Sequence, residues 1–360
     1  MGTYGLTTTT ATPKPALTTV TRWNDGVRRH TLYTVGEDNW GFYIPALTPA
    51  DQATRLSRFR AILGNQNWVF PAPDSVLPAA LCSPDVTVGR SVSTTTFTWV
   101  PVSYPASTPV IPPSLLSTWS LGTISPAQSI ALGVSALTAL ITATPGTFAL
   151  AGTGQGAVVI SQVLKALLPG GALSARSGDC IGATAFGNPL RAPGVGFPGG
   201  TDPGGAGILS SAITGQPLLS GLAGLTLPSW WMELTIPGDF FAAAPMSTMA
   251  APALQQAAQG VFLHPGGVDV PTLISNALPA LTGVGQLGNM VSRGLSQLSP
   301  AAVAAAVSWV SGRPALDPHY LYGVSSPTTL PTGSALSASA TYTDVAVEYL
   351  NGRGAAVTPR

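Results

Sequence analysis

Charged side chains are scarce in this chain of 360 residues. It has 15 Lys and Arg and 14 Asp and Glu, which make up 8% of the residues and leave a net charge of +1. A soluble domain usually carries about 25% charged residues, so small apolar and uncharged polar side chains must form most of this surface. A net charge so close to zero provides no basic field, and we therefore expect no nucleic-acid partner.

Cysteine is equally scarce. The two cysteines, Cys82 and Cys180, are not arranged in a C-x-x-C pattern. This arrangement argues against a zinc site or a redox motif, and it is compatible with one disulfide between the two cysteines. We expect neither a metal nor another cofactor.

Long apolar segments are missing as well. The N-terminus has neither the basic nor the apolar region of a signal peptide, so we expect no secretion signal. The most apolar run, 130–142, is shorter than the roughly 20 residues that a bilayer requires, and Pro145 and Gly146 follow it. We interpret this run as a buried helix and expect no transmembrane segment.

The low charge bears on how the protein exists in solution. A freely diffusing protein with so few charges tends to associate, whereas a subunit packed among neighbours needs fewer solvating charges. We therefore favour a subunit of an assembly, in contact with other proteins or with copies of itself. The alternative is a compositional bias of the whole organism, which would carry no functional meaning.

Strand-like and helix-like segments alternate along the chain. We expect a parallel sheet that helices cover on both faces, because such alternation is typical of α/β proteins. Ser125 followed by Pro126 predicts the start of a long helix. The expected strands are 30–35, 95–102, 147–151, 179–186 and 230–236, and further helices are expected over 48–63, 155–168 and 342–350.

Composition divides the chain into three parts. Residues 1–29, rich in Thr and Pro, predict an extended arm without a packed face of its own. Residues 245–311, rich in Ala, Leu and Gln, predict a helical insert. Residues 30–244 and 312–360 together form the expected α/β domain.

The most informative motif is Gly-Thr-Gly-Gln-Gly at 152–156, between an expected strand and an expected helix. It matches the G-x-S-x-G pattern of the nucleophile elbow, with Gly154 in place of the serine. The elbow serine sits at a strained positive φ, which glycine adopts without a Cβ clash. The motif therefore predicts a hydrolase turn that has lost its nucleophile.

The acid and the base of such a hydrolase follow the nucleophile in chain order. Asp239, in a turn after an expected strand, is the candidate acid, and His319 is the candidate base. The chain has three histidines; His30 precedes the elbow, and His264 lies in the expected insert and is the weaker candidate. The backbone N–H of Gln155 is the candidate oxyanion donor.

Four segments of the chain resemble lysin B, the mycobacteriophage esterase family that cuts mycolic acid from arabinogalactan. These are Gly152–Val159, Phe186–Arg191, Gly238–Asp239 and Pro318–Tyr322. The resemblance spans roughly residues 30–350 and implies a cutinase-like or lysin-B-like α/β-hydrolase fold. It also implies that Gly154 marks a vestigial nucleophile position, that Asp239 and His319 are the acid and the base, and that Thr153 and Asn188 belong to the binding region. Cutinases and the PE-PPE hydrolases share the elbow and remain alternative relatives.

The chain departs from the lysin B pattern in three places. Gly154 replaces the serine, Thr153 replaces an aromatic residue, and Gly36–Trp40 lacks the family's His-Gly-x-Gly. We therefore expect an inactive hydrolase domain in a virion protein, such as a minor tail or tail-tip component, that binds a glycolipid of the host envelope. The alternative is an active esterase that uses the Thr153 hydroxyl or a water molecule activated by His319.

Overall fold

The computed structural model describes residues 27–36, 84–102, 104, 125–210, 217–239, 241–244, 322–323 and 325–360. It also describes the backbone of 110–111 and 268–269. The arm before residue 27, the expected helix over 48–63 and nearly all of the expected insert lie outside these residues.

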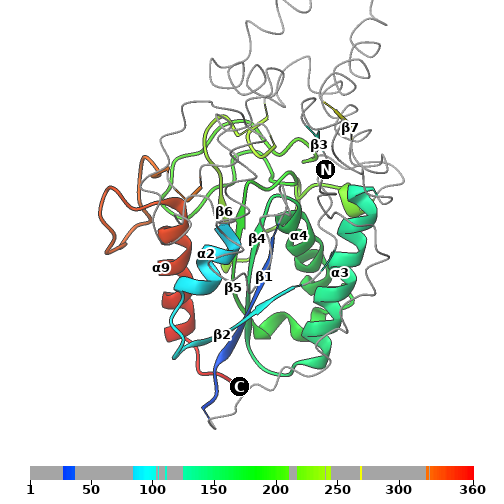
Figure 1. Ribbon diagram of the computed structural model, residues 1–360, viewed down its shortest axis with the longest axis vertical. Helices are drawn as coiled ribbons and strands as arrows, with labels where there is room; N and C mark the ends of the chain where they lie inside the picture. The colour runs from blue at the N-terminus through cyan, green and yellow to red at the C-terminus, as the bar shows by residue number, and fades with distance from the viewer. Residues whose placement is uncertain are drawn as a thin grey trace, which may run out of the picture.

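A parallel sheet of five strands forms the centre of the described fold (Figure 1). Its order is β2-β1-β4-β5-β6, so β4 occupies the middle position. The strands β1, β4 and β5 are buried along their whole length, as expected for a parallel sheet that is covered on both faces. The five expected strands are confirmed as β1 (His30–Val35), β2 (Phe97–Pro101), β4 (Phe148–Thr153), β5 (Cys180–Phe186) and β6 (Trp231–Leu234).

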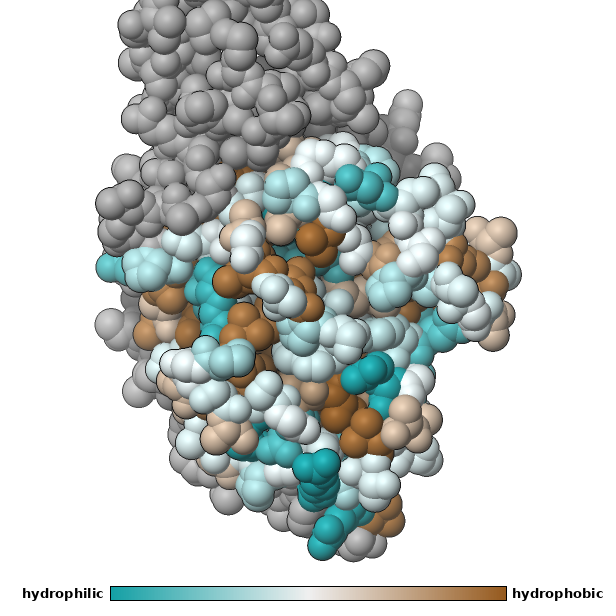
Figure 2. All heavy atoms as spheres, turned by 180° about the vertical axis from the view of Figure 1, so that it is seen from behind, coloured by the Kyte–Doolittle hydropathy of each residue, from teal (hydrophilic) through white to brown (hydrophobic). Residues whose placement is uncertain are grey.

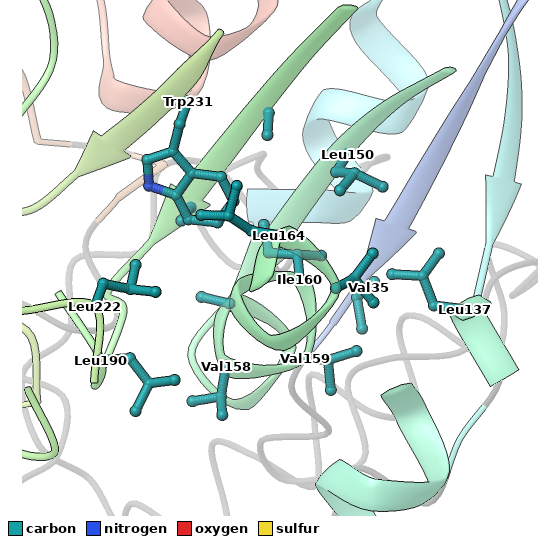
Figure 3. Close-up of a cluster of buried hydrophobic side chains, with 14 of the residues drawn as sticks. Val35, Leu137, Leu150, Val158, Val159, Ile160, Leu164, Leu190, Leu222 and Trp231 are labelled. Atoms are coloured by element: carbon teal, nitrogen blue, oxygen red, sulfur yellow. The ribbon is translucent and has the colours of Figure 1, made fainter. Parts of the chain in front are cut away.

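Two pairs of helices cover the two faces of this sheet (Figure 1). On one face, α4 (Gln155–Leu167) packs against the sheet and against α3 (Pro126–Ala143). On the other face lie α2 (Pro84–Ser91) and α9 (Tyr342–Ala355). Figure 3 shows the apolar side chains of α4 between those of α3 and β6.

The start of α3 follows from its sequence. The backbone N–H of Gln128 donates to Ser125 Oγ at 3.1 Å, and the N–H of Ser125 donates to Gln128 Oε1 at 2.8 Å. This capping box, followed by proline in the first turn, confirms the predicted start. By length and composition, α3 is the one helix among the described residues that is able to cross a membrane. Leu137 is buried against α4 while Leu132 is 50% exposed, so the helix that we interpreted as buried is buried along one face.

Several short elements were not predicted. These are the helix α2, the 3₁₀ turns Ser174–Asp179 and Pro217–Leu219, and a two-stranded parallel ladder of β3 (Val110–Ile111) with β7 (Val268–Asp269). The strand β7 lies inside the segment 245–311 that we expected to be a helical insert. Cys180 is a free, buried thiol, and Cys82 lies outside the described residues.

Candidate functional site

The elbow lies at the end of the central strand. Gly154 joins β4 to α4 with φ +53° and ψ −112°, which confirms the predicted positive φ. Its N–H donates to the carbonyl oxygen of Phe186 at 2.9 Å, and its own carbonyl accepts from Val158 N–H at 3.2 Å. L-residues occupy this backbone region only under strain, as the elbow serine of a hydrolase does.

The glycines on either side of Gly154 let the helix begin close to the sheet. A Cβ on Gly156 would lie 1.9 Å from the carbonyl oxygen of Val35, and a Cβ on Gly152 would lie 2.6 Å from that of Gly156. Only a residue without a Cβ fits either position. A central parallel sheet, helices on both faces and this elbow after the middle strand settle the architecture. The fold is that of an α/β-hydrolase.

Comparison with solved structures finds esterases of similar fold. Lysin B from a mycobacteriophage is 18% identical with a TM-score of 0.38, over 72% of this chain and 90% of its own. A cutinase-like protein from Cryptococcus sp. is 13% identical with a TM-score of 0.33, over 72% and 97%. An acetylxylan esterase is 14% identical with a TM-score of 0.33, over 70% and 99%. At identities of 13–18%, these structures are similar to this chain in fold alone.

The comparisons by sequence give no relative. No protein-family model and no curated protein matches the chain.

The residues next to Gly154 bind neighbouring helices through their side chains. Thr153 is buried, and its Oγ1 accepts from Asp85 N–H at 3.2 Å, which ties β4 to the start of α2. Gln155 is also buried, and its Oε1 accepts from Ser129 Oγ of α3 at 2.8 Å. Gln155 is the first residue of α4, where backbone N–H groups point out of the helix end. Its role as oxyanion donor fits this position and stays a prediction.

The candidate acid lies at the same edge of the sheet as the elbow. Asp239 follows β6 as Gly154 follows β4, and the strands are parallel, so both come from their carboxyl ends. The Asp239 side chain is fully buried. Its Oδ1 accepts from the N–H of Phe241 at 2.8 Å and of Ala242 at 3.2 Å. The N–H of Asp239 donates to the carbonyl oxygen of Ile236 at 3.0 Å, which confirms the predicted turn at 237–239.

A tyrosine that the sequence did not indicate also contacts the acid. The hydroxyl of Tyr322 donates to Asp239 Oδ2 at 2.6 Å and accepts from Ile236 N–H at 3.3 Å. Burial, and then the charge of Asp239, raise the pKa of Tyr322 well above its usual value. Tyr322 lies three residues after His319 in the sequence. His319 and His264 lie outside the described residues.

Two further buried side chains, those of His30 and Arg191, bond to backbone carbonyl oxygens. His30, at the opposite edge of the sheet, is fully buried and bonds through Nε2 to the carbonyl oxygens of Gly354 and Val357, each at 3.0 Å. Arg191 is also fully buried, and its guanidinium donates to backbone carbonyl oxygens of the surrounding loops. Its acceptors are Ala242 at 2.7 Å, Val195 at 2.7 Å and Gly204 at 2.6 Å.

Asn188 belongs to a buried polar network. Its Nδ2 donates to Ser161 Oγ at 3.0 Å and to Glu233 Oε1 at 2.8 Å, and its Oδ1 accepts from Leu190 N–H at 3.0 Å. Trp231 Nε1 donates to the same oxygen of Glu233 at 2.9 Å. These contacts give Asn188 a structural role between α4 and β6, and a ligand-binding role for it stays a prediction.

Glu233 is the unusual member of this network. The side chain is fully buried, and its Oε2 has no hydrogen-bond partner in the described part of the chain. Burial raises the pKa of Glu233 to about 7, although the bonds from Asn188 and Trp231 and the charge of Arg191 oppose the rise. The folded protein therefore binds a proton here more tightly than the unfolded chain does.

Glu233→Gln is expected to make the protein more stable at neutral pH. Because the folded pKa of Glu233 is raised from 4.5 to about 7, its effect on stability is most favourable below pH 4.5 and declines up to pH 7. At about 1.4 kcal/mol per pH unit this decline amounts to roughly 3 kcal/mol, and the neutral glutamine avoids it. Urea unfolding at pH 5, 6, 7 and 8 measures the effect.

Glu348→Gln serves as the control, because Glu348 is half-buried and bonds to Ser334 Oγ and Ala335 N–H. We expect the stability of Glu348→Gln to decline between pH 5 and pH 7 as much as that of the native chain. An unchanged decline in Glu233→Gln would show that Glu233 is not the titrating group.

Proposed function

We propose that this chain is a non-catalytic hydrolase domain that serves as a structural protein of a phage virion, as a minor tail or tail-tip component. The observation that carries the proposal is Gly154 in the elbow conformation. The turn that presents the nucleophile is retained, and the residue at its tip has no side chain with which to attack an ester.

The loss of the nucleophile removes the covalent route. No acyl-enzyme forms on a Cα, and loss of the serine from a well-studied triad costs on the order of a million-fold in kcat. The Thr153 hydroxyl, the alternative nucleophile of an active esterase, is poorly placed to attack an ester. Its side chain is buried and accepts a hydrogen bond from α2. The remaining route is a water molecule activated by His319.

The composition of the surface supports an assembly. Charged residues make up 8% of the chain, and Figure 2 shows pale and brown residues over most of the described face seen from behind, with few teal ones. The whole of α3 contains no charged residue. A surface of this kind suits a subunit that neighbours cover, such as other virion proteins or further copies of this chain.

The envelope as a binding partner follows from the resemblance of four segments to lysin B. The domain keeps the elbow turn and the buried acid at one edge of the sheet, without the nucleophile. We propose that this edge binds a glycolipid of the host envelope, and that the protein acts in adsorption.

Quantitative mass spectrometry of purified particles tests the structural role. The expected result is a fixed copy number per particle that survives a gradient and a high-salt wash. Recovery of the protein only from the particle-free lysate would contradict it.

Sedimentation of the purified chain with isolated mycobacterial cell walls tests the binding role, and delipidated walls are the control.

A further inference from the structure

We infer that Tyr322 is a positioning residue for Asp239, and that the bond between them fixes Tyr322 at the end of β6. In this chain the Asp239 side chain thus serves the fold through its hydrogen bonds. This inference rests on the proposed function, because it gives the acid a use in a domain that does not catalyse. The contacts that support it do not depend on catalysis.

Both oxygens of the Asp239 carboxylate are engaged within the protein. Oδ1 accepts from two backbone N–H groups of its own turn, and Oδ2 accepts from the Tyr322 hydroxyl at 2.6 Å. The carbonyl oxygen of Asp239 also accepts from Ala243 N–H at 2.7 Å. Hydrogen bonds to a buried, charged acceptor are stronger than neutral ones, and loss of one partner leaves the other unsatisfied.

Tyr322 is held as firmly as its partner. The ring is fully buried and makes edge-to-face contacts with Phe186 of β5 and Tyr342 of α9, at centroid distances of 5.7 and 5.6 Å. Its hydroxyl accepts from Ile236 N–H, just past the end of β6. Tyr322 therefore joins the acid, the end of β6 and the start of α9.

A double-mutant cycle on the full chain tests the inference. Tyr322→Phe, Asp239→Asn and the double variant are compared with the native chain by urea unfolding, and amide hydrogen exchange is followed at Ile236. We expect the loss in the double variant to be smaller than the sum of the two single losses by at least tenfold in the unfolding equilibrium constant. We also expect exchange at Ile236 to be at least tenfold faster in Tyr322→Phe, because its N–H loses its acceptor.

Tyr349→Phe is the matched control. Its hydroxyl is buried without a hydrogen-bond partner among the described residues, so its removal leaves exchange at Ile236 unchanged. Additive losses in the cycle, or equal exchange at Ile236 in Tyr322→Phe and in the control, would overturn the inference. Neither outcome bears on ester hydrolysis, so failure here is distinct from failure of the proposed function.

Discussion

Gly156→Ala is expected to prevent the chain from folding stably. The new Cβ would lie 1.9 Å from the carbonyl oxygen of Val35, a backbone atom of the sheet that has no rotamer by which to withdraw. Moving α4 outward instead would open the core between α4 and the sheet, and the cost of several kcal/mol approaches the 5–15 kcal/mol by which a domain is stable.

Circular dichroism during heating measures the effect, and Gly178→Ala is the control, since a Cβ there meets nothing within 4 Å. The control is expected to melt like the native chain, whereas Gly156→Ala is expected to lack a cooperative transition. Equal melting of the two variants would mean that α4 does not begin as close to β1 as the elbow requires.

Gly154→Ser is expected to create an esterase. The backbone at this position already has the conformation of an elbow nucleophile, so a serine would present its Oγ at the tip of the turn. A complete triad is worth on the order of 10⁶-fold, and a missing oxyanion donor costs about 10²–10³-fold. Because the loop after β1 lacks the His-Gly-x-Gly of the resembling family, we expect a gain on the order of 10³-fold.

The rate of hydrolysis of a short p-nitrophenyl ester measures this gain. Gly154→Ala is the control, because it bears the same backbone strain, roughly 1–3 kcal/mol, without a hydroxyl. His319→Ala and Asp239→Asn, each introduced into the Gly154→Ser chain, are expected to abolish the gain. A folded Gly154→Ser chain that is no faster than Gly154→Ala would contradict the assignment of the triad.

Local signals in the sequence predicted most of the described fold. Alternation and uninterrupted apolar runs indicated the five strands, and a cap followed by proline marked the start of α3 at Ser125. The helix α2 was missed because Val86, Thr87, Val88 and Gly89 are poor helix formers. Its stability comes from packing, since Val88 is buried and a Cβ on Gly89 would lie 2.2 Å from Trp99.

The site was predictable where a turn motif specifies it, and not where distant residues meet. The elbow at Gly154 and the turn at Asp239 follow from short patterns and from chain order. The bond from Tyr322 to Asp239 joins residues 83 positions apart, and that from Asn188 to Glu233 joins residues 45 apart. Such pairs are set by the order of the strands, which a single sequence does not reveal.

Hydrolysis of a short p-nitrophenyl ester by the native chain, alongside His319→Ala, tests the central claim most directly. Because Gly154 offers no nucleophile, we predict that the two proteins hydrolyse the ester at the same rate, and no faster than an unrelated protein of equal concentration. A native rate clearly above that background, lost in His319→Ala, would show that the chain is an active esterase and would contradict the account.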